Sequence, residues 1–499
     1  MTSSEPLPGA EVDIATLLEG YRTKKYTAVD VIQSYLDRVE ALDRNGPKIN
    51  SIITVSDAAL ARAAELDAYL ESTGNLVGPL HGVPMVLKDN MDTRDMPTTH
   101  GSETMAGFMP GRDATAVERL RDAGAILFAK TTLSEWTMSW FSYASISGTT
   151  KNPCALDHDT GASSAGTGAA VSADLAVAGL GTDCGGSVRL PSSFCNLVGF
   201  RSTPGVVPRD GTGPLLAVQD TVGPMTKTVA DNAIILDVIK GYTPKDPASV
   251  AARIAGGYGS FVDHVDPAGL NGKRLGFLTS ALGPDSNPDS KAVNTVIRGA
   301  VAAVEAAGAT VVEVQIDDLS AKIAATSFYL DESLRDINAF LAEYENSPVK
   351  ELTEVTAAGR HHQNLGLLLD VVKASNTPED DPDYLLRAYR RHDMAKELLN
   401  LFGAFELDAL IYPSCQVPAP ATATMGDIVI LEFPTNTVIA SQALLPAISV
   451  PAGFTEDGLP VGLEFVGLPY ADVKLMGLAA GFENATHARR PARLENAGA

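Results

Sequence analysis

The sequence has little cysteine and no recognisable metal-binding pattern. Its four cysteines, in 499 residues, are too few and too scattered for a disulfide framework, and none stands in a Cys-x-x-Cys pair. The motif His-Glu-x-x-His is absent, and the adjacent His361 and His362 cannot share one face of a helix. We therefore expect no metal and no other cofactor, and we expect a reducing cytoplasm as the setting.

Signals for secretion or membrane insertion are also lacking. Residues 1–13 have neither a basic region nor an apolar core, so we expect no signal peptide. The longest uncharged run, residues 433–455, contains polar side chains and three prolines, which predicts buried strand and turn rather than a membrane span. We expect the protein to act away from membranes.

Basic residues are the minority among the charged ones. The chain has 38 Lys and Arg against 61 Asp and Glu, a formal net charge of −23 at pH 7. Because phosphate backbones and anionic membranes attract basic surfaces, this balance argues against nucleic acid and membrane partners. It favours an uncharged or cationic small-molecule substrate. The length allows either two or three domains or one large α/β unit.

The most informative stretch is residues 161–192. Two loops rich in serine and glycine flank an alanine-rich segment, in which residues 169–173 suit a short helix and residues 175–180 a buried strand. One helix and one strand would return the chain, so the two loops can meet in space. Their glycines leave backbone N–H groups free to face a ligand.

Three interpretations of this stretch compete. A dinucleotide fingerprint is disfavoured, because Gly166-Thr167-Gly168 lacks the third glycine. Close packing of a helix accounts for the alanines but not for the serines and glycines on either side. A nucleophilic serine beside backbone donors accounts for both. No Gly-x-Ser-x-Gly elbow occurs, which argues against the α/β-hydrolase type of serine enzyme.

The same stretch resembles the signature of the amidase signature family. Residues 183–191 read Asp-Cys-Gly-Gly-Ser-Val-Arg-Leu-Pro and fit the family pattern D-x-G-G-S-[apolar]-R-x-P, and Ser163 precedes Ser187 at the family's spacing. Ala162 and Ala165 stand where glycines are usual in the family. Residues 82–89, Gly-Val-Pro-Met-Val-Leu-Lys-Asp, resemble the segment that carries the family's catalytic lysine, which places that lysine at Lys88.

The resemblance implies a fold and a domain organisation. It predicts an α/β protein with a large mixed central β-sheet covered by helices on both faces. Residues 1–499 would form a single amidase domain, with a signature core at about 75–235. A variable helical region at about 316–400 carries no motif, and we expect substrate-specific helices there.

The resemblance also implies a catalytic triad. Lys88, as a neutral amine, would take a proton from Ser163, which would take one from the nucleophile Ser187. A neutral lysine at pH 7 requires its pKa to fall from about 10.4 by roughly three units. In the family the serine at the Ser163 position follows a cis peptide bond, here the bond from Ala162.

Further residues of the signature would assist the triad. The backbone N–H groups of a turn would hold the oxyanion, and three side chains would support the loops, with Ser164 hydrogen-bonded to Lys88. The turn consists of Cys184, Gly185, Gly186 and Ser187, and the supporting residues are Ser164, Asp183 and Arg189.

An aromatic segment before the first loop is our candidate for a substrate-binding wall. Residues 135–143 hold both tryptophans of the chain, and from this segment we select Met138 and Trp140, although such clusters often belong to a core. Residues 136–143 and 212–222 contain neither Lys nor Arg, which favours neutral aryl or alkyl amides, with carbamates and esters as relatives. Arg189 could still clamp a carboxylate if it is not consumed in bracing the loop.

Two other functions stay open. One branch of the family hydrolyses glutamine as part of an amidotransferase complex, and this chain could do the same beside a partner. A ligand-binding protein without catalysis is disfavoured, because Lys88, Ser163 and Ser187 are all present.

Overall fold

The computed structural model describes residues 11–254, 259–492 and 494. Most of the segment that bears on a signal peptide, residues 1–10, therefore lies outside the described residues. Within the described ranges, no helix combines the length and the apolar content needed to cross a membrane. The same ranges hold no group of three or more His, Cys, Asp or Glu placed to bind a metal ion.

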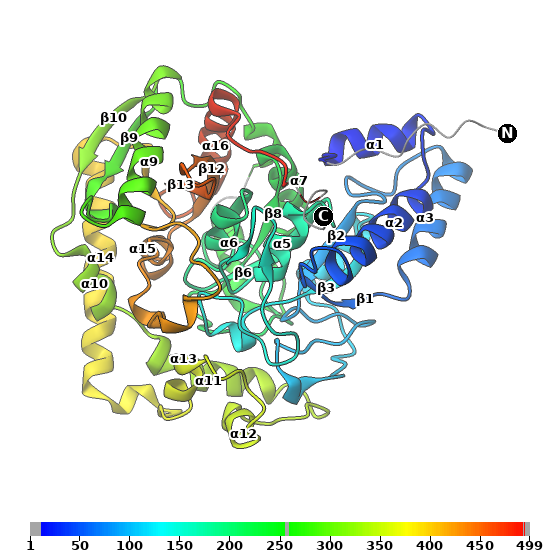
Figure 1. The fold of residues 1–499 in the computed structure, drawn as a ribbon, viewed down its shortest axis with the longest axis horizontal. Coiled ribbons are helices and arrows are strands. Elements are labelled where there is room, and N and C mark those ends of the chain that lie inside the picture. Colours follow the sequence, from blue (N-terminus) through cyan, green and yellow to red (C-terminus); the bar gives the residue numbers. More distant parts are fainter. Residues whose placement is uncertain (1–10, 255–258, 493, 495–499) are drawn as a thin grey trace.

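An eleven-stranded sheet runs through the described part of the molecule (Figure 1). β2 pairs in parallel with β3 and β6, the strands from β6 through β8, β7, β12 and β13 to β11 pair antiparallel, and β11, β9 and β10 are again parallel. In spatial order the strands are β1 (Ile52–Val55), β3 (Ile126–Thr131), β2 (Pro84–Lys88), β6 (Ala178–Asp183), β8 (Thr221–Thr226), β7 (Val198–Arg201), β12 (Ala447–Phe454), β13 (Pro460–Val466), β11 (Ala409–Pro413), β9 (Arg274–Leu278) and β10 (Thr310–Val314). β4 (Lys151–Asn152) and β5 (Ala155–Asp159) form a separate hairpin.

Helices pack on the sheet in two separate rows. α7, α16 and α9 contact one another in turn and lie on β7, β8, β12 and β13, whereas α5 and α6 contact each other and lie on strands of the same part of the sheet. The predicted fold class, a large mixed sheet with helices on both faces, is confirmed. The helices outside residues 316–400 are α1 (Ile14–Arg22), α2 (Ala28–Arg38), α3 (Ala59–Thr73), α4 (Thr115–Asp122), α5 (Ala165–Ser172), α6 (Arg189–Phe194), α7 (Val229–Ile239), α8 (Ala251–Ile254), α9 (Pro288–Ala306), α15 (Thr437–Gln442) and α16 (Asp472–Thr486).

Residues 316–400 are mainly helical, as the sequence predicts. Their helices gather at one side of the molecule, where the long helix α14 runs along its edge (Figure 1). They are α10 (Leu319–Ala325), α11 (Tyr329–Leu341), α12 (Leu352–Ala357), α13 (Gly366–Val371) and α14 (Pro382–Phe405).

The strand expected at residues 175–180 begins three residues later. Asp174 adopts a left-handed backbone conformation, with φ of 55°, and ends the turn that leaves α5. The Leu175 N–H donates to the Ala170 carbonyl, so residues 175–177 belong to the link between helix and strand. Their apolar character reflects complete burial, and the Val177 N–H already donates to the Pro84 carbonyl of β2 at 3.1 Å.

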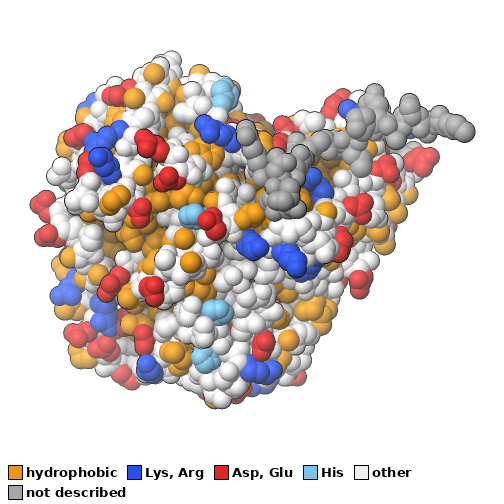
Figure 2. Space-filling model, in the orientation of Figure 1, with side chains coloured by type: hydrophobic (Ala, Val, Ile, Leu, Met, Phe, Trp, Pro, Cys, Tyr) orange, Lys and Arg blue, Asp and Glu red, His pale blue; other side chains and the backbone are white. Residues whose placement is uncertain are grey.

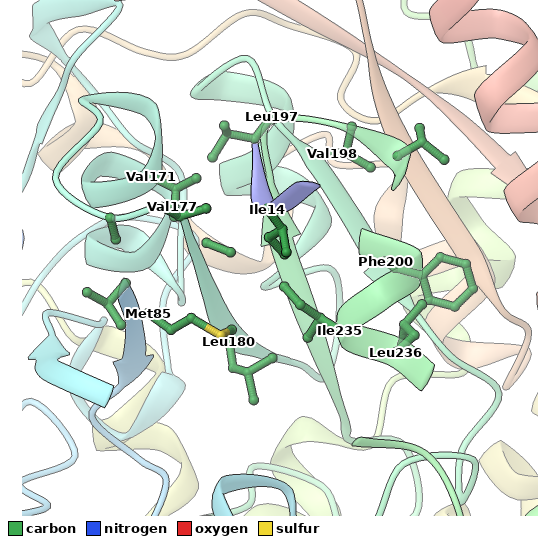
Figure 3. Close-up of a cluster of buried hydrophobic side chains, with 14 of the residues drawn as sticks. Ile14, Met85, Val171, Val177, Leu180, Leu197, Val198, Phe200, Ile235 and Leu236 are labelled. Atoms are coloured by element: carbon green, nitrogen blue, oxygen red, sulfur yellow. The ribbon is translucent and has the colours of Figure 1, made fainter. Parts of the chain in front are cut away.

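The core beside the signature segment joins elements that are distant in sequence. Figure 3 shows Met85 of β2, Leu180 of β6, Phe200 of β7 and Leu236 of α7 directed into one cluster with Ile14 of α1. All five side chains are almost completely buried. This packing holds β2 and β6 side by side. On the face drawn in Figure 2, acidic and basic side chains are interspersed.

Candidate active site

Two parallel strands bring the signature residues to one edge of the sheet. β2 ends at Lys88 and β6 ends at Asp183, and the two strands pair in parallel with Leu87 opposite Leu180. Because parallel strands end on the same side, the segments that follow them lie together, which is where α/β proteins bind ligands. Ser163 reaches this edge from the loop that precedes α5.

Lys88 forms the centre of the site. Its Nζ donates hydrogen bonds of 2.7 Å to Ser163 Oγ and of 2.7 Å to Thr182 Oγ1. Lys88 and Ser163 are both fully buried, and the peptide bond from Ala162 to Ser163 is cis. The geometry thus joins the predicted lysine and the first predicted serine directly.

The surroundings of Lys88 favour its uncharged form. Burial lowers the pKa of Lys88 from its ordinary 10.5 to about 7, although the carboxylates of Asp220 and Asp183 oppose this shift. Among the described residues, no carboxylate lies within ion-pair distance of Lys88. The neighbouring buried lysine, Lys130, differs because it forms an ion pair of 2.9 Å with Asp89. Near pH 7, much of Lys88 is therefore a free amine.

Ser187 lies beside this pair, in a loop that is hydrogen-bonded to the loop of Ser163, and lines a small cavity. No group in the described ranges makes a hydrogen bond to the Ser187 hydroxyl, which leaves it available to a ligand. The Ser187 carbonyl accepts from the Ser164 N–H at 3.1 Å, and this bond ties the two signature loops together. Ser164 does not contact Lys88 as expected: its hydroxyl donates to the Thr182 carbonyl at 3.3 Å.

The turn at residues 184–187 keeps its backbone donors free. Gln219 and Thr437 each donate a hydrogen bond of 2.7 Å, to the carbonyls of Cys184 and Gly185 respectively. None of the hydrogen bonds within the described ranges uses the N–H groups of residues 184–187. Burial also raises the pKa of the Cys184 thiol well above its ordinary value, so this cysteine stays protonated and is a poor nucleophile.

Asp183 and Arg189 lie in a buried ion-pair cluster. Arg189 donates to Asp183 Oδ1 at 3.0 Å and to Glu464 Oε2 at 2.8 Å, and Arg201 also donates to Asp183 Oδ1 at 3.0 Å. Although burial opposes it, the two guanidinium groups hold the pKa of Asp183 well below its usual range. Each guanidinium nitrogen of Arg189 has a protein acceptor, Ser441 among them, so this residue is consumed in bracing rather than free to clamp a carboxylate.

The cavity beside Ser187 is predominantly apolar. Its walls come from the aromatic segment, the signature turn, the helical region and residues 430–431, and they include neither Lys nor Arg in the described part of the chain. They are formed by Thr137, Ser139, Trp140, Gly185, Ser187, Leu215, Tyr329, Leu367, Ile430 and Leu431.

Comparison with known proteins identifies the family of the chain. A model of the amidase family matches residues 30–476. The chain belongs to the amidase signature family. The peptide amidase of Stenotrophomonas maltophilia is similar to it, with 33% sequence identity, a TM-score of 0.88, and 98% of this chain and 100% of that chain covered.

Two further members differ in the activity that their names state. One, from Alkaliphilus metalliredigens, is named as a component of the glutamyl-tRNA(Gln) amidotransferase and is 33% identical over 485 residues, which are 95% of this chain and 96% of that protein. A bacterial aryl acylamidase shares the fold with a TM-score of 0.79 at 24% identity, covering 96% of this chain and 97% of that chain. Membership therefore establishes an amidase signature enzyme that acts on carbon–nitrogen bonds, without fixing the substrate.

The two residues selected for the substrate-binding wall lie differently. Trp140 lines the cavity, whereas Met138 is completely buried in the apolar cluster that also contains Trp140 and is not among the lining residues. Of the other apolar residues in the two expected segments, only Leu215 reaches the cavity. An aromatic-rich sequence does not show which of its side chains face the cavity and which face the core.

Several residues of this amidase site carry no sequence signal that we recognised. Tyr329 and Leu367 enter the cavity from α11 and α13, in the region without motifs. Glu464 joins the ion-pair cluster from β13. Thr182 was the easiest of the site residues to predict from the sequence, since it directly precedes the Asp183 motif.

The ion-pair cluster predicts a large effect of one isosteric substitution. Asp183→Asn leaves Arg189 and Arg201 buried without the carboxylate they share, since Glu464 pairs only with Arg189. We expect the free energy of unfolding, measured with urea, to fall by about 3–5 kcal/mol. Asp157→Asn is the control, because the Asp157 side chain is 85% exposed and should change stability by less than about 0.5 kcal/mol. Equal stability of the two variants would contradict this account.

Proposed function

We propose that this chain is a free-standing amidase that hydrolyses small neutral amides through an acyl-enzyme, with Lys88, Ser163 and Ser187 as its triad. The observation that carries the proposal is the 2.7 Å bond between the Lys88 amine and Ser163 Oγ, in a loop that is hydrogen-bonded to Ser187, which lines the cavity. A serine hydroxyl is a weak nucleophile at neutral pH and needs such a base. The uncharged state of Lys88 provides one.

In the proposed acylation, Ser187 Oγ attacks the carbonyl carbon of the amide. The Ser187 proton passes to Ser163 Oγ as the Ser163 proton passes to Lys88 Nζ. The oxygen of the tetrahedral intermediate, now negative, accepts hydrogen bonds from N–H groups of residues 184–187, which lack other partners within the described chain. Such preorganised donors are worth several kcal/mol in the transition state.

Acylation ends when the carbon–nitrogen bond breaks and the leaving amine recovers a proton from Lys88 through Ser163. In deacylation, a water molecule attacks the Ser187 ester while Lys88 again accepts a proton through Ser163. The carboxylic acid then leaves as Ser187 Oγ recovers that proton by the same path, which restores the free amine of Lys88. Carbamates and esters are possible alternative substrates, since they pass through a similar oxyanion.

The apolar walls of the cavity support neutral substrates. Trp140, Leu215 and Leu367 offer apolar surface, whose burial stabilises a bound ligand by about 25 cal/mol per Å². A carboxylate in the same place would lose hydration without gaining a cation, which is costly. The similarity to a peptide amidase supports an amide as the scissile group.

Hydrolysis of glutamine for an amidotransferase is the second candidate. Relatives at 31–34% identity are named as components of glutamyl-tRNA(Gln) amidotransferases. Glutamine has a free carboxylate, for which the described walls of the cavity provide neither Lys nor Arg. Purification of the chain together with stoichiometric partner proteins would favour this candidate.

We further propose that residues 1–499 act as one catalytic unit in a reducing cytoplasm. The sheet draws strands from residues 52–466 into one layer around the site. All four cysteines have free thiols, which suits a reducing setting.

The titration of Lys88 predicts the pH dependence of the reaction. Only the free amine can accept a proton, so kcat/KM for a neutral amide should rise with pH and level off above the Lys88 pKa of about 7. Below that pKa the rate should fall about tenfold per pH unit. Initial rates from pH 5.5 to 9, with circular dichroism to verify folding at each pH, test this. A flat profile in a protein that stays folded would reject Lys88 as the base.

Charge selectivity provides a second test. Hexananilide and glutaranilic acid differ in that a carboxylate replaces a terminal ethyl group, and we expect kcat/KM to favour hexananilide by at least about tenfold, or 1.4 kcal/mol. Glutamine should be a poor substrate for the same reason. A tenfold preference for glutaranilic acid, or efficient release of ammonia from glutamine, would instead favour the glutamine-hydrolysing candidate.

A further inference from the structure

Tyr329 is a buried tyrosine whose hydroxyl is unused by the protein. It begins α11, its side chain is 5% exposed, and its Oη has no hydrogen-bond partner among the described residues. A buried hydroxyl without a partner weakens the folded state. Such groups are uncommon in folded proteins and call for an explanation, which a ligand can provide.

The Tyr329 hydroxyl lies at the edge of the proposed oxyanion turn. A Cβ atom added to Gly185 would lie 2.0 Å from Tyr329 Oη and 2.5 Å from Cη2 of Trp140, so both side chains press against this glycine. The rings of Trp140 and Tyr329 meet edge to face, with centroids 6.4 Å apart. Tyr329 is therefore part of the wall that a substrate bound to Ser187 would touch.

A second cavity adjoins the first at this point. It has a volume of about 410 Å³ and shares Trp140, Tyr329 and Leu431 with the cavity at Ser187. Its remaining wall combines apolar side chains with polar uncharged ones, and the one charged side chain in the described wall is Glu432. The polar uncharged residues are Ser320, Ser327, Gln416, Thr435, Asn436 and Gln442.

These features define what the second cavity can bind. Hydroxyl and amide side chains exchange hydrogen bonds with a polar group but do not compensate an anion, and Glu432 repels one. Gln416, Thr435, Asn436 and Gln442 already have hydrogen-bond partners within the protein, but a hydrocarbon chain would leave the Tyr329 hydroxyl unsatisfied. A polar, non-anionic group that spans both cavities would pass Tyr329, whose hydroxyl could donate to an acceptor on it.

We propose that the second cavity is a subsite for a polar extension of the acyl group and that Tyr329 selects substrates by donating a hydrogen bond to that extension. The substrate class is amides whose acyl part carries a further uncharged acceptor, such as an acylamino group. This inference rests on the proposed amidase function and specifies its substrates. Tyr329 acts in specificity and does not take part in proton transfer.

A matched pair of amides tests the role of Tyr329. N-acetylphenylalaninamide and 3-phenylpropanamide share the scissile amide and the phenyl group, and only the first carries an acylamino group. We expect the native enzyme to favour the first by at least tenfold in kcat/KM. Tyr329→Phe should lower kcat/KM at least tenfold for the first amide and less than threefold for the second, because it removes only the hydroxyl.

Two further variants separate specificity from structural effects. Tyr35→Phe removes the hydroxyl of another buried tyrosine, on α2, that lines neither cavity, and it should leave both substrates unchanged. Ala324→Phe adds a ring to an exposed position in the wall of the second cavity. It should reduce turnover of the acylamino substrate at least tenfold and spare 3-phenylpropanamide.

Failure of the proposed role of Tyr329 can be distinguished from failure of the proposed amidase function. Equal losses on both amides in Tyr329→Phe would show that Tyr329 supports the turn instead of selecting substrates, which overturns the inference. No effect of Tyr329→Phe or Ala324→Phe on the acylamino substrate would also overturn it, while leaving the amidase function intact. Failure of the native enzyme to hydrolyse either amide in a Ser187-dependent manner would overturn the proposed function itself.

Discussion

The burial of the Lys88 amine, with no carboxylate at ion-pair distance in the described part of the chain, is the constraint on which the site depends. A charged ammonium group taken out of water is costly unless a carboxylate compensates it, and Lys130 shows the compensated case through Asp89. Lys88 has only the hydroxyls of Ser163 and Thr182 within 2.7 Å. The protein therefore stabilises a free amine at the end of β2. This amine can accept a proton from Ser163 in the first signature loop.

The second requirement is a rigid turn in front of that amine. The shared pairing of Asp183 with Arg189 and Arg201 fixes both ends of residues 183–189, and Glu464 extends the cluster to β13. Thr437, on α15, holds the Gly185 carbonyl. Residues from the last fifth of the chain thus orient backbone donors next to Ser187. The continuous sheet is needed because it brings these distant residues to the short signature motifs.

The sequence motifs were sufficient to predict the contact between Lys88 and Ser163 and, through the resemblance to the amidase signature family that they carry, the mixed sheet. They were insufficient for contacts between distant segments. Tyr329 and Glu464 reach the site only through the order of strands and the packing of the variable helices. Met138, unlike Trp140, is not among the residues that line the cavity at Ser187.

Trapping of the acyl-enzyme tests the central claim, that Lys88 activates Ser187 through Ser163, most directly. A serine-directed phosphonate followed by peptide mapping should find one label per chain, at Ser187, and Lys88→Ala should slow labelling at least about a hundredfold, the usual contribution of a general base. Ser172→Ala, a buried serine on α5 outside the proton path, should label at the native rate. A label at Ser163 or Cys184, or a labelling rate unaffected by Lys88→Ala, would contradict the mechanism.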